Sequence, residues 1–431
     1  MALHLSRNKA YIRLKNSRLF KDSFWALIGN VLNKGLSLLA GIIVARWLGA
    51  EEYGEYGMIK NTLIYIAVFS TFGLGFSVTK FIAHHKETDI GKLYLISRAA
   101  NLISLAFSGI MALLLFIFSE SVASYLEMPQ TSLTIKFTAI AVVFNSLATV
   151  QIAVLAGLKE FKRTARINFQ IGLVTFIASI CGTYFYGLDG AIMALVITNF
   201  ANCILNFLLI RKLIRPGDIS YHDIIKEVTH LIRFSFPIAI QESTISISFW
   251  LGNLLLIKLS DYHQLGLYSA AAQWGGIVLY IPGVLQNVML SHLSTSVAQQ
   301  GNSKTLLHRM LALNFCMTLI PFIVVAVLSS FIASIYGASY SDLPPVLNIC
   351  VATAIFNCLI QVYIQEYIAK GRTWILCLIR SIRDILALVL AWILITNISD
   401  IDAAILYTTS YLVAAIFCLA NLTALNKKIN N

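Results

Sequence analysis

The sequence predicts an all-α polytopic membrane protein with twelve transmembrane helices in two six-helix lobes. Three observations predict this fold. The 431 residues are 58% hydrophobic and 12% charged, with a mean hydropathy of +0.78, which excludes an ordinary soluble domain. Long apolar segments recur at short intervals along the whole chain. The Lys and Arg residues cluster in the tails and in every second connection between those segments.

Each predicted span follows from length, because a helix needs about 20 mostly apolar residues to cross the hydrocarbon core of a membrane. The first apolar segment is too long for a signal peptide and lacks a cleavage site, so we expect it to be retained. No soluble domain interrupts the connections. The predicted spans are residues 23–45, 57–82, 94–118, 133–157, 166–186, 189–210, 234–257, 265–290, 309–333, 343–368, 374–395 and 402–425.

The positive charge orients these spans. Lys and Arg near helix ends stay on the cytoplasmic side, so their alternation predicts a bacterial inner (cytoplasmic) membrane protein with both termini inside. Because the cytoplasmic helix ends carry most of the Lys and Arg residues, the membrane topology explains most of the net charge of +12. We therefore expect no nucleic-acid partner. The basic connections lie around residues 80–98, 159–166, 211–233, 304–309 and 370–383.

The longest connection divides the chain in half. Ser220 and Asp223 match a capping box, and apolar residues from Ile224 to Ile232 recur at helical spacing. This pattern predicts an amphipathic helix on the cytoplasmic surface, with an ordinary surface loop as the alternative. The predicted domains are an N-lobe at 1–212, the linker at 213–233 and a C-lobe at 234–431.

The two halves also resemble each other. A shift of 212 residues places Arg46 on Lys258 and Gly54 on Gly266. Spans 1 and 7 both run outward, so the pattern predicts a parallel repeat about a pseudo-two-fold axis along the membrane normal. The alternative is chance similarity between two apolar sequences.

Four stretches carry a resemblance to a known family. They are Ala45–Gly54 at the first outer turn, Leu155–Lys162 after span 4, Phe236–Pro237 opening span 7 and Gly266–Ala271 opening span 8. Their order and spacing, over about residues 20–425, resemble the polysaccharide transporter family, which includes O-antigen flippases. This family belongs to the multidrug, oligosaccharidyl-lipid and polysaccharide exporter superfamily.

The resemblance implies two six-helix lobes around a central cavity that alternates its access. It also implies a substrate, an undecaprenyl-pyrophosphate-linked oligosaccharide moved from the cytoplasmic to the periplasmic leaflet. Membrane lipid is an expected partner, and a polysaccharide polymerase is a further candidate partner. The family implies no enzyme activity and no cofactor.

Ionisable side chains within a span mark candidate sites, because each costs about 2.5–3.5 kcal/mol to insert. In span 1, Asn30, Asn33 and Lys34 share one helical face. Lys34 lies about ten residues into the span, roughly 15 Å deep. We expect this stripe to face the cavity and attract the pyrophosphate; the alternative is a Lys paired with an interior carboxylate.

Span 11 carries the second predicted cationic group. Arg380, Arg383 and Asp384 share one helical face in the cytoplasmic half of the membrane. Arg suits phosphate because its planar fork can donate two hydrogen bonds. The alternative is snorkelling of both Arg side chains, with Arg380 and Asp384 paired to each other.

Acidic and amide residues supply the other candidate contacts. Glu242 in span 7 maps onto Asn30 by the repeat shift, and a buried carboxylate there predicts coupling to H⁺ or Na⁺, with Asp384 as a second coupling residue. The alternative for Glu242 is a structural counter-charge, and Glu366 is expected at the interface. An i, i+4, i+8 stripe predicts sugar contacts or helix–helix hydrogen bonds; its members are Asn357, Gln361 and Gln365.

Three cations near the outer turns predict a gate. Arg46, Lys60 and Lys258 would pair with outer acidic residues such as Glu51, Glu52 or Asp261 when the outer side closes. The alternative is interfacial anchoring.

Two other functions compete with the flippase interpretation. A multidrug or cation antiporter of the same superfamily is expected to favour carboxylates and aromatics over Lys and Arg in its cavity. A membrane glycosyltransferase or polymerase would need outward-facing catalytic acids, and the short outer loops offer only scattered ones such as Asp400 and Asp402. The seven Cys residues show no CxxC spacing, and no metalloprotease, P-loop or dinucleotide motif is present, so we expect no metal site.

Overall fold

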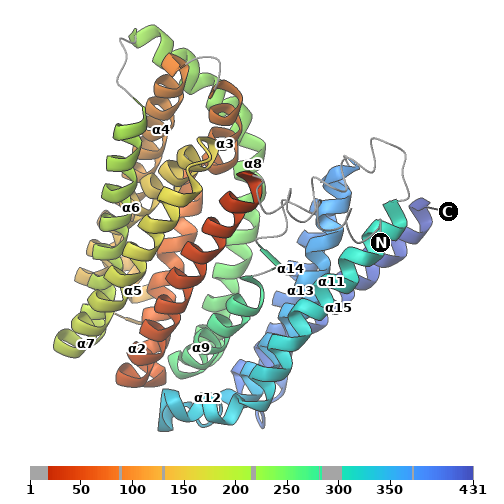
Figure 1. Ribbon diagram of the computed structural model, residues 1–431. Helices are drawn as coiled ribbons and strands as arrows, with labels where there is room; N and C mark the ends of the chain where they lie inside the picture. The colour runs from red at the N-terminus through yellow and green to blue at the C-terminus, as the bar shows by residue number, and fades with distance from the viewer. Residues whose placement is uncertain are drawn as a thin grey trace, which may run out of the picture. The chain divides into compact units, whose positions relative to one another are not determined.

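The structure is a computed structural model of the chain, and it describes residues 18–86, 90–128, 132–214, 220–280, 282–283, 303–370 and 373–430. Throughout these residues the secondary structure is helical, without a strand (Figure 1). The helices are α2 (Arg18–Thr71), α3 (Leu74–His85), α4 (Ile90–Ile117), α5 (Ser119–Tyr125), α6 (Ser132–Gly157), α7 (Phe161–Leu213), α8 (Tyr221–Leu259), α9 (Tyr262–Val278), α11 (Ser303–Val327), α12 (Ser329–Tyr336), the 3₁₀ turn η2 (Ala338–Tyr340), α13 (Leu343–Ala369), α14 (Thr373–Asn397) and α15 (Ala403–Asn430).

Within the described residues, seven helices are long and apolar enough to cross a membrane, so the chain is a multi-pass membrane protein. Two of them are far too long to cross only once. The apolar part of α2 runs over 41 residues and α7 over 53, which correspond to about 60 and 80 Å against a hydrocarbon core of about 30 Å.

Each of these two helices is broken by a glycine at the expected turn. Gly49 in α2 has φ 76° and ψ 174°, and it lies between the predicted spans 23–45 and 57–82. Gly187 in α7 has φ 54° and ψ −134°, and it lies between the predicted spans 166–186 and 189–210. Positive φ values of this kind are accessible to glycine at little cost. Both helices are therefore divided into two arms.

The two arms of α7 pack directly on each other. A Cβ added to Gly190 would overlap the backbone carbonyl of Gly182, and the reverse holds for Gly182. Backbones approach this closely only where neither residue carries a side chain. The arms of α7 therefore form a tight antiparallel hairpin.

Several predicted spans match single helices within a few residues: α4, α6, α13, α14 and α15. Two are divided. The predicted span 57–82 is interrupted at Phe72 and Gly73, both with positive φ, before α3 begins. The predicted span 309–333 divides at Leu328, where α11 ends and α12 begins. The last part of the predicted span 265–290 lies outside the described residues.

The connection at 213–233 differs from its prediction as a separate surface helix. α8 begins directly after Ser220 and continues without interruption to Leu259, so the linker stripe and the seventh predicted span form one helix. Leu231 is fully buried in a core cluster with residues of α3, α4 and α6, and Val228 and Ile232 pack against that cluster. The apolar stripe therefore faces protein.

The chain forms two compact units. Unit 1 comprises residues up to Ala40 together with Ile59–Ser243, and unit 2 comprises Gly41–Met58 together with Thr244–Asn431. The division assigns the segment around Gly49, residues 41–58, to the second unit, and we call this segment the elbow. The sequence-based boundaries at 212 and 233 stay a prediction.

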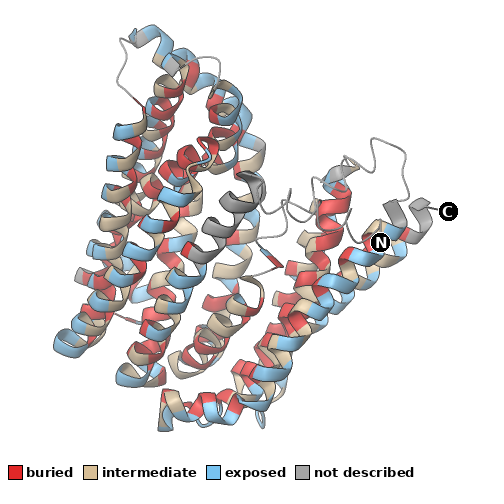
Figure 2. Ribbon diagram, viewed as in Figure 1, coloured by how far each residue is buried: buried red, intermediate tan, exposed pale blue. Residues whose placement is uncertain are grey.

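Both units expose large apolar side chains suited to contact with lipid. Figure 2 marks the exposed residues of each unit in pale blue. On α4, Leu113 and Ile117 are 59% and 61% exposed, and on α11 Val327 is 76% exposed. Apolar surface of this extent is unfavourable in water, and a bilayer removes the penalty. Within each unit, the buried residues lie on helix faces that contact other helices of the same unit (Figure 2).

Candidate functional site

The elbow belongs to unit 2 because glycines allow its backbone to touch α9. A Cβ on Gly54 would overlap the carbonyl of Tyr262, and a Cβ on Gly266 would overlap the carbonyl of Ala50. The contact is reciprocal, since the shift of 212 residues places Ala50 on Tyr262 and Gly54 on Gly266. Self-complementary contacts of this kind are typical of a two-fold axis.

Tyrosines fasten the elbow to the rest of unit 2. The Tyr340 hydroxyl donates to the carbonyls of Ala45 at 3.3 Å and Gly49 at 3.2 Å. Burial raises the pKa of Tyr340, so its phenol keeps the proton that it donates. The side chain of Gln273 donates to the Tyr53 hydroxyl. The two Tyr340 bonds satisfy carbonyls beside the break at Gly49, where the helical hydrogen-bond pattern is interrupted.

The predicted outer cations take other positions. The Arg46 guanidinium donates to the Ile335 carbonyl at 3.2 Å, and Asp261 accepts from the backbone N–H of Gln264 at 2.8 Å as the N-cap of α9. Lys258 is exposed in the last turn of α8. At the elbow, glycine contacts and tyrosine hydrogen bonds hold the backbone, and the pattern of charges predicted neither. The repeat pairing of Gly54 with Gly266 was the signal that could have found them.

A cavity of about 280 Å³ lies within unit 2, among α8, α9, α13, α14 and α15. Arg383 and Asn357 line it together with the hydroxyls of Thr353 and Thr408. A second cavity of about 70 Å³ shares Leu279 and Asn357 with the first. The first cavity is otherwise lined by aromatic and small residues: Phe249, Tyr268, Ala272, Gly275, Gly276, Leu279, Cys350, Ala354, Ala387, Tyr411, Ala414 and Ala415.

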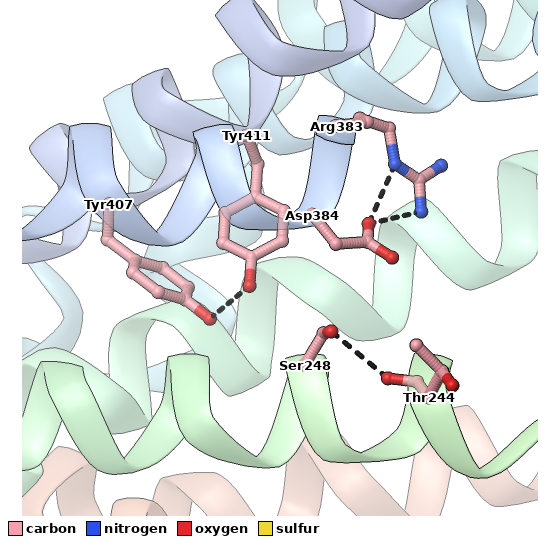
Figure 3. Close-up of polar contacts among 6 residues, drawn as sticks. All are labelled: Thr244, Ser248, Arg383, Asp384, Tyr407 and Tyr411. Atoms are coloured by element: carbon pink, nitrogen blue, oxygen red, sulfur yellow. Dashed lines mark hydrogen bonds and ion pairs between the residues drawn. The ribbon is translucent and has the colours of Figure 1, made fainter. Parts of the chain in front are cut away.

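Arg383 reaches this cavity while it is bound to Asp384 (Figure 3). Its Nε and Nη2 atoms donate to Oδ1 of Asp384 at 2.8 and 2.5 Å, and Asp384 is 6% exposed. The helical spacing had favoured Arg380 as the partner of Asp384. The structure pairs Asp384 with Arg383 instead, because the long Arg side chain can fold back onto the neighbouring carboxylate.

Hydroxyl and aromatic groups surround this ion pair. Figure 3 shows the hydroxyls of Tyr407 and Tyr411 on α15 and of Ser248 on α8 pointing into the same region. The two phenols are hydrogen-bonded at 3.3 Å, and the Tyr411 ring stacks on Phe249 with centroids 6.1 Å apart. A Cβ on Gly252 would overlap both phenol oxygens, so this glycine leaves room for them.

The amide stripe of α13 is only partly at the cavities. Asn357 lines both cavities, and Gln361 lines the smaller one beside Asn314. Gln365 is 8% exposed and lines neither. The first two residues of the stripe therefore stay candidates for substrate contact, and the third lies in the packed interior.

Unit 1 holds a second group of cations. Lys34 is exposed and Lys60 is half-buried, and their ammonium groups are close enough to repel each other. The prediction that puts Lys60 near the outer end of its span rests on a helix beginning at 57. The second arm of α2 begins directly after Gly49, which places Lys60 about 16 Å along it, and Lys34 lies about 22 Å before the same break.

The amides beside Lys34 are not all in the same environment. Asn33 packs on Gly172 of α7. A Cβ added to Gly172 would lie 3.0 Å from the Cα of Asn33, so this part of the stripe contacts protein. The side chain of Asn30 lies outside the described part of the structure. Lys34 therefore remains the exposed member of the stripe.

Two acidic residues complete the candidate set. Glu242 is half-buried in α8, next to the last residue of unit 1. Glu366, expected at the interface, is instead 1% exposed, and its Oε1 accepts from Lys370 Nζ at 2.6 Å. Within the described residues its Oε2 has no partner. The i, i+4 spacing of Glu366 and Lys370 was the sequence signal for this buried pair.

Comparisons with known proteins agree with this architecture. The sequence model of a family described as "Polysaccharide biosynthesis protein" matches residues 19–289. The chain is 23% identical over 410 residues to a Shigella flexneri protein named "Putative O-antigen transporter", covering 92% of this chain and 96% of the relative.

Solved structures show the same fold. An inward-facing multidrug resistance MATE family transporter of the MOP superfamily has a TM-score of 0.72 and 16% identity, over 93% of this chain and 99% of its own. The lipid II flippase MurJ in an inward closed conformation has a TM-score of 0.73 and 16% identity, over 93% of this chain and 87% of its own. These likenesses establish the fold for nearly the whole chain.

Proposed function

Because the chain belongs to the polysaccharide biosynthesis protein family, we propose that it is a flippase for a polyprenyl-pyrophosphate-linked oligosaccharide. The membership confirms the resemblance found in the sequence, and the Shigella flexneri relative is named as a putative O-antigen transporter. The proposed substrate is an O-antigen or other surface polysaccharide unit on undecaprenyl pyrophosphate. Two six-helix lobes of twelve spans in the bacterial inner membrane, with cytoplasmic termini, would carry it outward by alternating access.

The observation that carries this proposal is the position of Arg383 in the cavity of unit 2. Two of its nitrogen atoms are held by Asp384, and no described residue accepts from Nη1. A fixed guanidinium with a remaining donor suits a phosphate oxygen. The amide of Asn357 and the hydroxyl of Thr408 line the same cavity and suit sugar hydroxyls or phosphate.

The size of the cavity supports a head-group site. About 280 Å³ lies at the lower edge of the range of small-molecule sites, roughly 300–1,000 Å³. A pyrophosphate head group fits this scale, whereas a complete lipid-linked oligosaccharide exceeds it. Transport by this route therefore requires the cavity to widen, as alternating access provides.

The multidrug or cation antiporter is the second candidate, and one observation favours it. Phe249, Tyr268 and Tyr411 line the same cavity, and aromatic faces attract organic cations. Arg383 opposes that function, since a fixed positive charge in the cavity repels a cation. Export of cationic dyes that depends on these rings, in a protein that does not complement a flippase-null strain, would favour the antiporter.

Lys34 and Lys60 provide the test of the flippase in unit 1. Lys34→Ala and Lys60→Ala are each expected to lower flipping about tenfold, because each removes a charge-assisted hydrogen bond to phosphate. Removal of one ammonium also relieves the repulsion of the other, so folding should be preserved. The measurement is complementation of a flippase-null strain together with the rate of lipid-linked oligosaccharide flipping in proteoliposomes.

Lys136→Ala is the matched control, because Lys136 is half-buried but pairs with the exposed Glu120 at 3.5 Å. It should leave transport unchanged. Full complementation by both Lys34→Ala and Lys60→Ala at normal protein levels would reject the cationic site.

Ion coupling is proposed through Glu242. Asp384 is neutralised by Arg383, so the half-buried Glu242 is the better coupling candidate of the two predicted carboxylates. Glu242→Gln is expected to make flipping insensitive to an imposed H⁺ or Na⁺ gradient, measured in proteoliposomes. Glu227→Gln, a buried carboxylate in the same helix, should keep the gradient dependence. Unchanged dependence in Glu242→Gln would exclude this role.

A further inference from the structure

A further cavity lies in unit 1 and shares no residue with the two cavities of unit 2. Its volume is about 550 Å³, and it is formed by α4, α6 and the second arm of α7. This volume falls well within the range of ligand sites. The flippase proposal gives this cavity no role.

Two arginines line the cavity. Arg98 on α4 and Arg211 in the last turn of α7 both line it, and both are exposed. In the described part of the chain, neither makes an ion pair. Both also belong to connections whose charge predicts the cytoplasmic side of the membrane. The cavity therefore presents two available cations at the level of the cytoplasmic head groups.

Most of the remaining wall is apolar, and part of it is exposed. Leu105 on α4 and Phe207 on α7 are 48% and 51% exposed, although they line the cavity. The lining residues of α4 from Tyr94 to Leu105 recur on one helical face over eleven residues, about 16 Å. A groove of this length and character, open toward hydrocarbon, suits acyl chains.

A buried amide also lines the cavity. Gln151 of α6 is 2% exposed, its Nε2 donates to Cys203 Sγ at 3.6 Å, and its Oε1 has no partner in the described residues. A buried acceptor without a partner is unfavourable. If the amide turns over, the Cys203 thiol can donate to the carbonyl oxygen, and the amide N–H groups then face the cavity as donors.

We propose that this groove binds an anionic phospholipid of the cytoplasmic leaflet. The phosphate lies against Arg98 and Arg211, the glycerol ester carbonyls accept from Gln151, and the acyl chains lie along Leu105 and Phe207. Basic pockets between transmembrane helices on the cytoplasmic side bind anionic head groups in this way. A polyprenyl diphosphate lacks the glycerol esters, so the buried amide favours the phospholipid.

The experiment measures lipid binding to the purified full-length protein in neutral detergent. Phosphatidylglycerol and phosphatidylcholine with the same acyl chains are titrated in turn, and bound lipid is counted by native mass spectrometry. Phosphatidylglycerol should bind more tightly by about 25-fold, since each arginine contributes about fivefold. Arg98→Gln and Arg211→Gln should each lose about fivefold of the affinity for phosphatidylglycerol, and the double variant should bind both lipids equally.

Arg166→Gln is the matched control, because Arg166 is an exposed arginine of α7 that does not line the cavity. It should bind phosphatidylglycerol as the unsubstituted protein does. Equal binding of the two lipids by the unsubstituted protein, or full binding by the double variant, would overturn the proposal. So would displacement of phosphatidylglycerol by inorganic phosphate alone, or by polyprenyl diphosphate at equal concentration.

Discussion

Replacement of Arg383 by Gln together with Asp384 by Asn is expected to abolish transport in a protein that still folds and inserts. Arg383 is the cation of the unit 2 cavity, and its loss removes a charge-assisted bond to the pyrophosphate worth about 3 kcal/mol, or roughly 100-fold in rate. The two amides can hydrogen-bond to each other, so neither leaves a buried charge behind. Flipping in proteoliposomes and thermal unfolding in detergent are the two measurements.

The single variant separates binding from stability. Arg383→Gln alone leaves the carboxylate of Asp384, which is 6% exposed, without its partner, and this should cost about 3–5 kcal/mol of unfolding free energy. The double variant should recover most of that loss and remain inactive. A double variant that flips substrate at the normal rate would show that Arg383 does not bind the head group.

Substitution of Gly266 by Ala is expected to destabilise the protein by about 3 kcal/mol, the upper range for overpacking, because the new Cβ meets backbone. It would overlap the Ala50 carbonyl, which a change of rotamer cannot move. Gly54→Ala should have a similar effect through the Tyr262 carbonyl. Thermal unfolding in detergent measures both. The two substitutions together should cost less than the sum, since they disrupt one contact.

Each glycine has a control on its own helix. Gly276 in α9 and Gly35 in α2 have open space where a Cβ would be placed. Gly276→Ala and Gly35→Ala should be neutral or stabilising by up to about 1 kcal/mol, because Ala is the better helix former. If Gly266→Ala matched Gly276→Ala in stability, the close backbone contact at the elbow would be refuted.

The positions of most spans were readable from the sequence. Apolar length alone determined α4, α6, α13 and α15, since a bilayer demands helices of about 20 apolar residues regardless of what they contact. The turn at Gly187 lies between two predicted spans, whereas the break at Phe72 and Gly73 was not predicted, although a glycine occupies it. The family resemblance was likewise visible in the motifs, and membership of the polysaccharide biosynthesis protein family confirms it.

Tertiary partners were not readable in the same way. Hydropathy shows that the stripe containing Leu231 is apolar. It does not show whether this stripe contacts lipid or packs on α3 and α4, as it does in the structure. The i, i+4 helical spacing predicted that Arg380 pairs with Asp384. In the structure the flexible Arg383 side chain forms the hydrogen bond to Asp384. Lys60 was predicted near the end of a span that begins at 57, because the polar residues before 57 gave no sign that the helical arm begins directly after Gly49.

The candidate site was predicted in part for the same reason. Charge within apolar sequence indicated Arg383 and Lys34, because burial of charge is costly whatever the fold. The aromatic wall around Arg383 and the groove at Arg98 could not be found this way, since Phe, Tyr and exposed Arg are ordinary at such positions. Only the arrangement of helices makes them neighbours.

The contacts of the elbow also determine the order in which parts of the protein can be packed as the chain is synthesised. Residues 41–58 leave the ribosome well before the segments that they contact, α9 and η2. The last of these contacts, Tyr340, is synthesised about 280 residues later. At a synthesis rate of about 10 residues per second, the first hairpin waits roughly half a minute for its partner. During that time Gly54 and Tyr53 lack their contacts with α9 and are exposed to lipid or to the membrane-insertion machinery. The elbow is therefore completed long after its own residues are made.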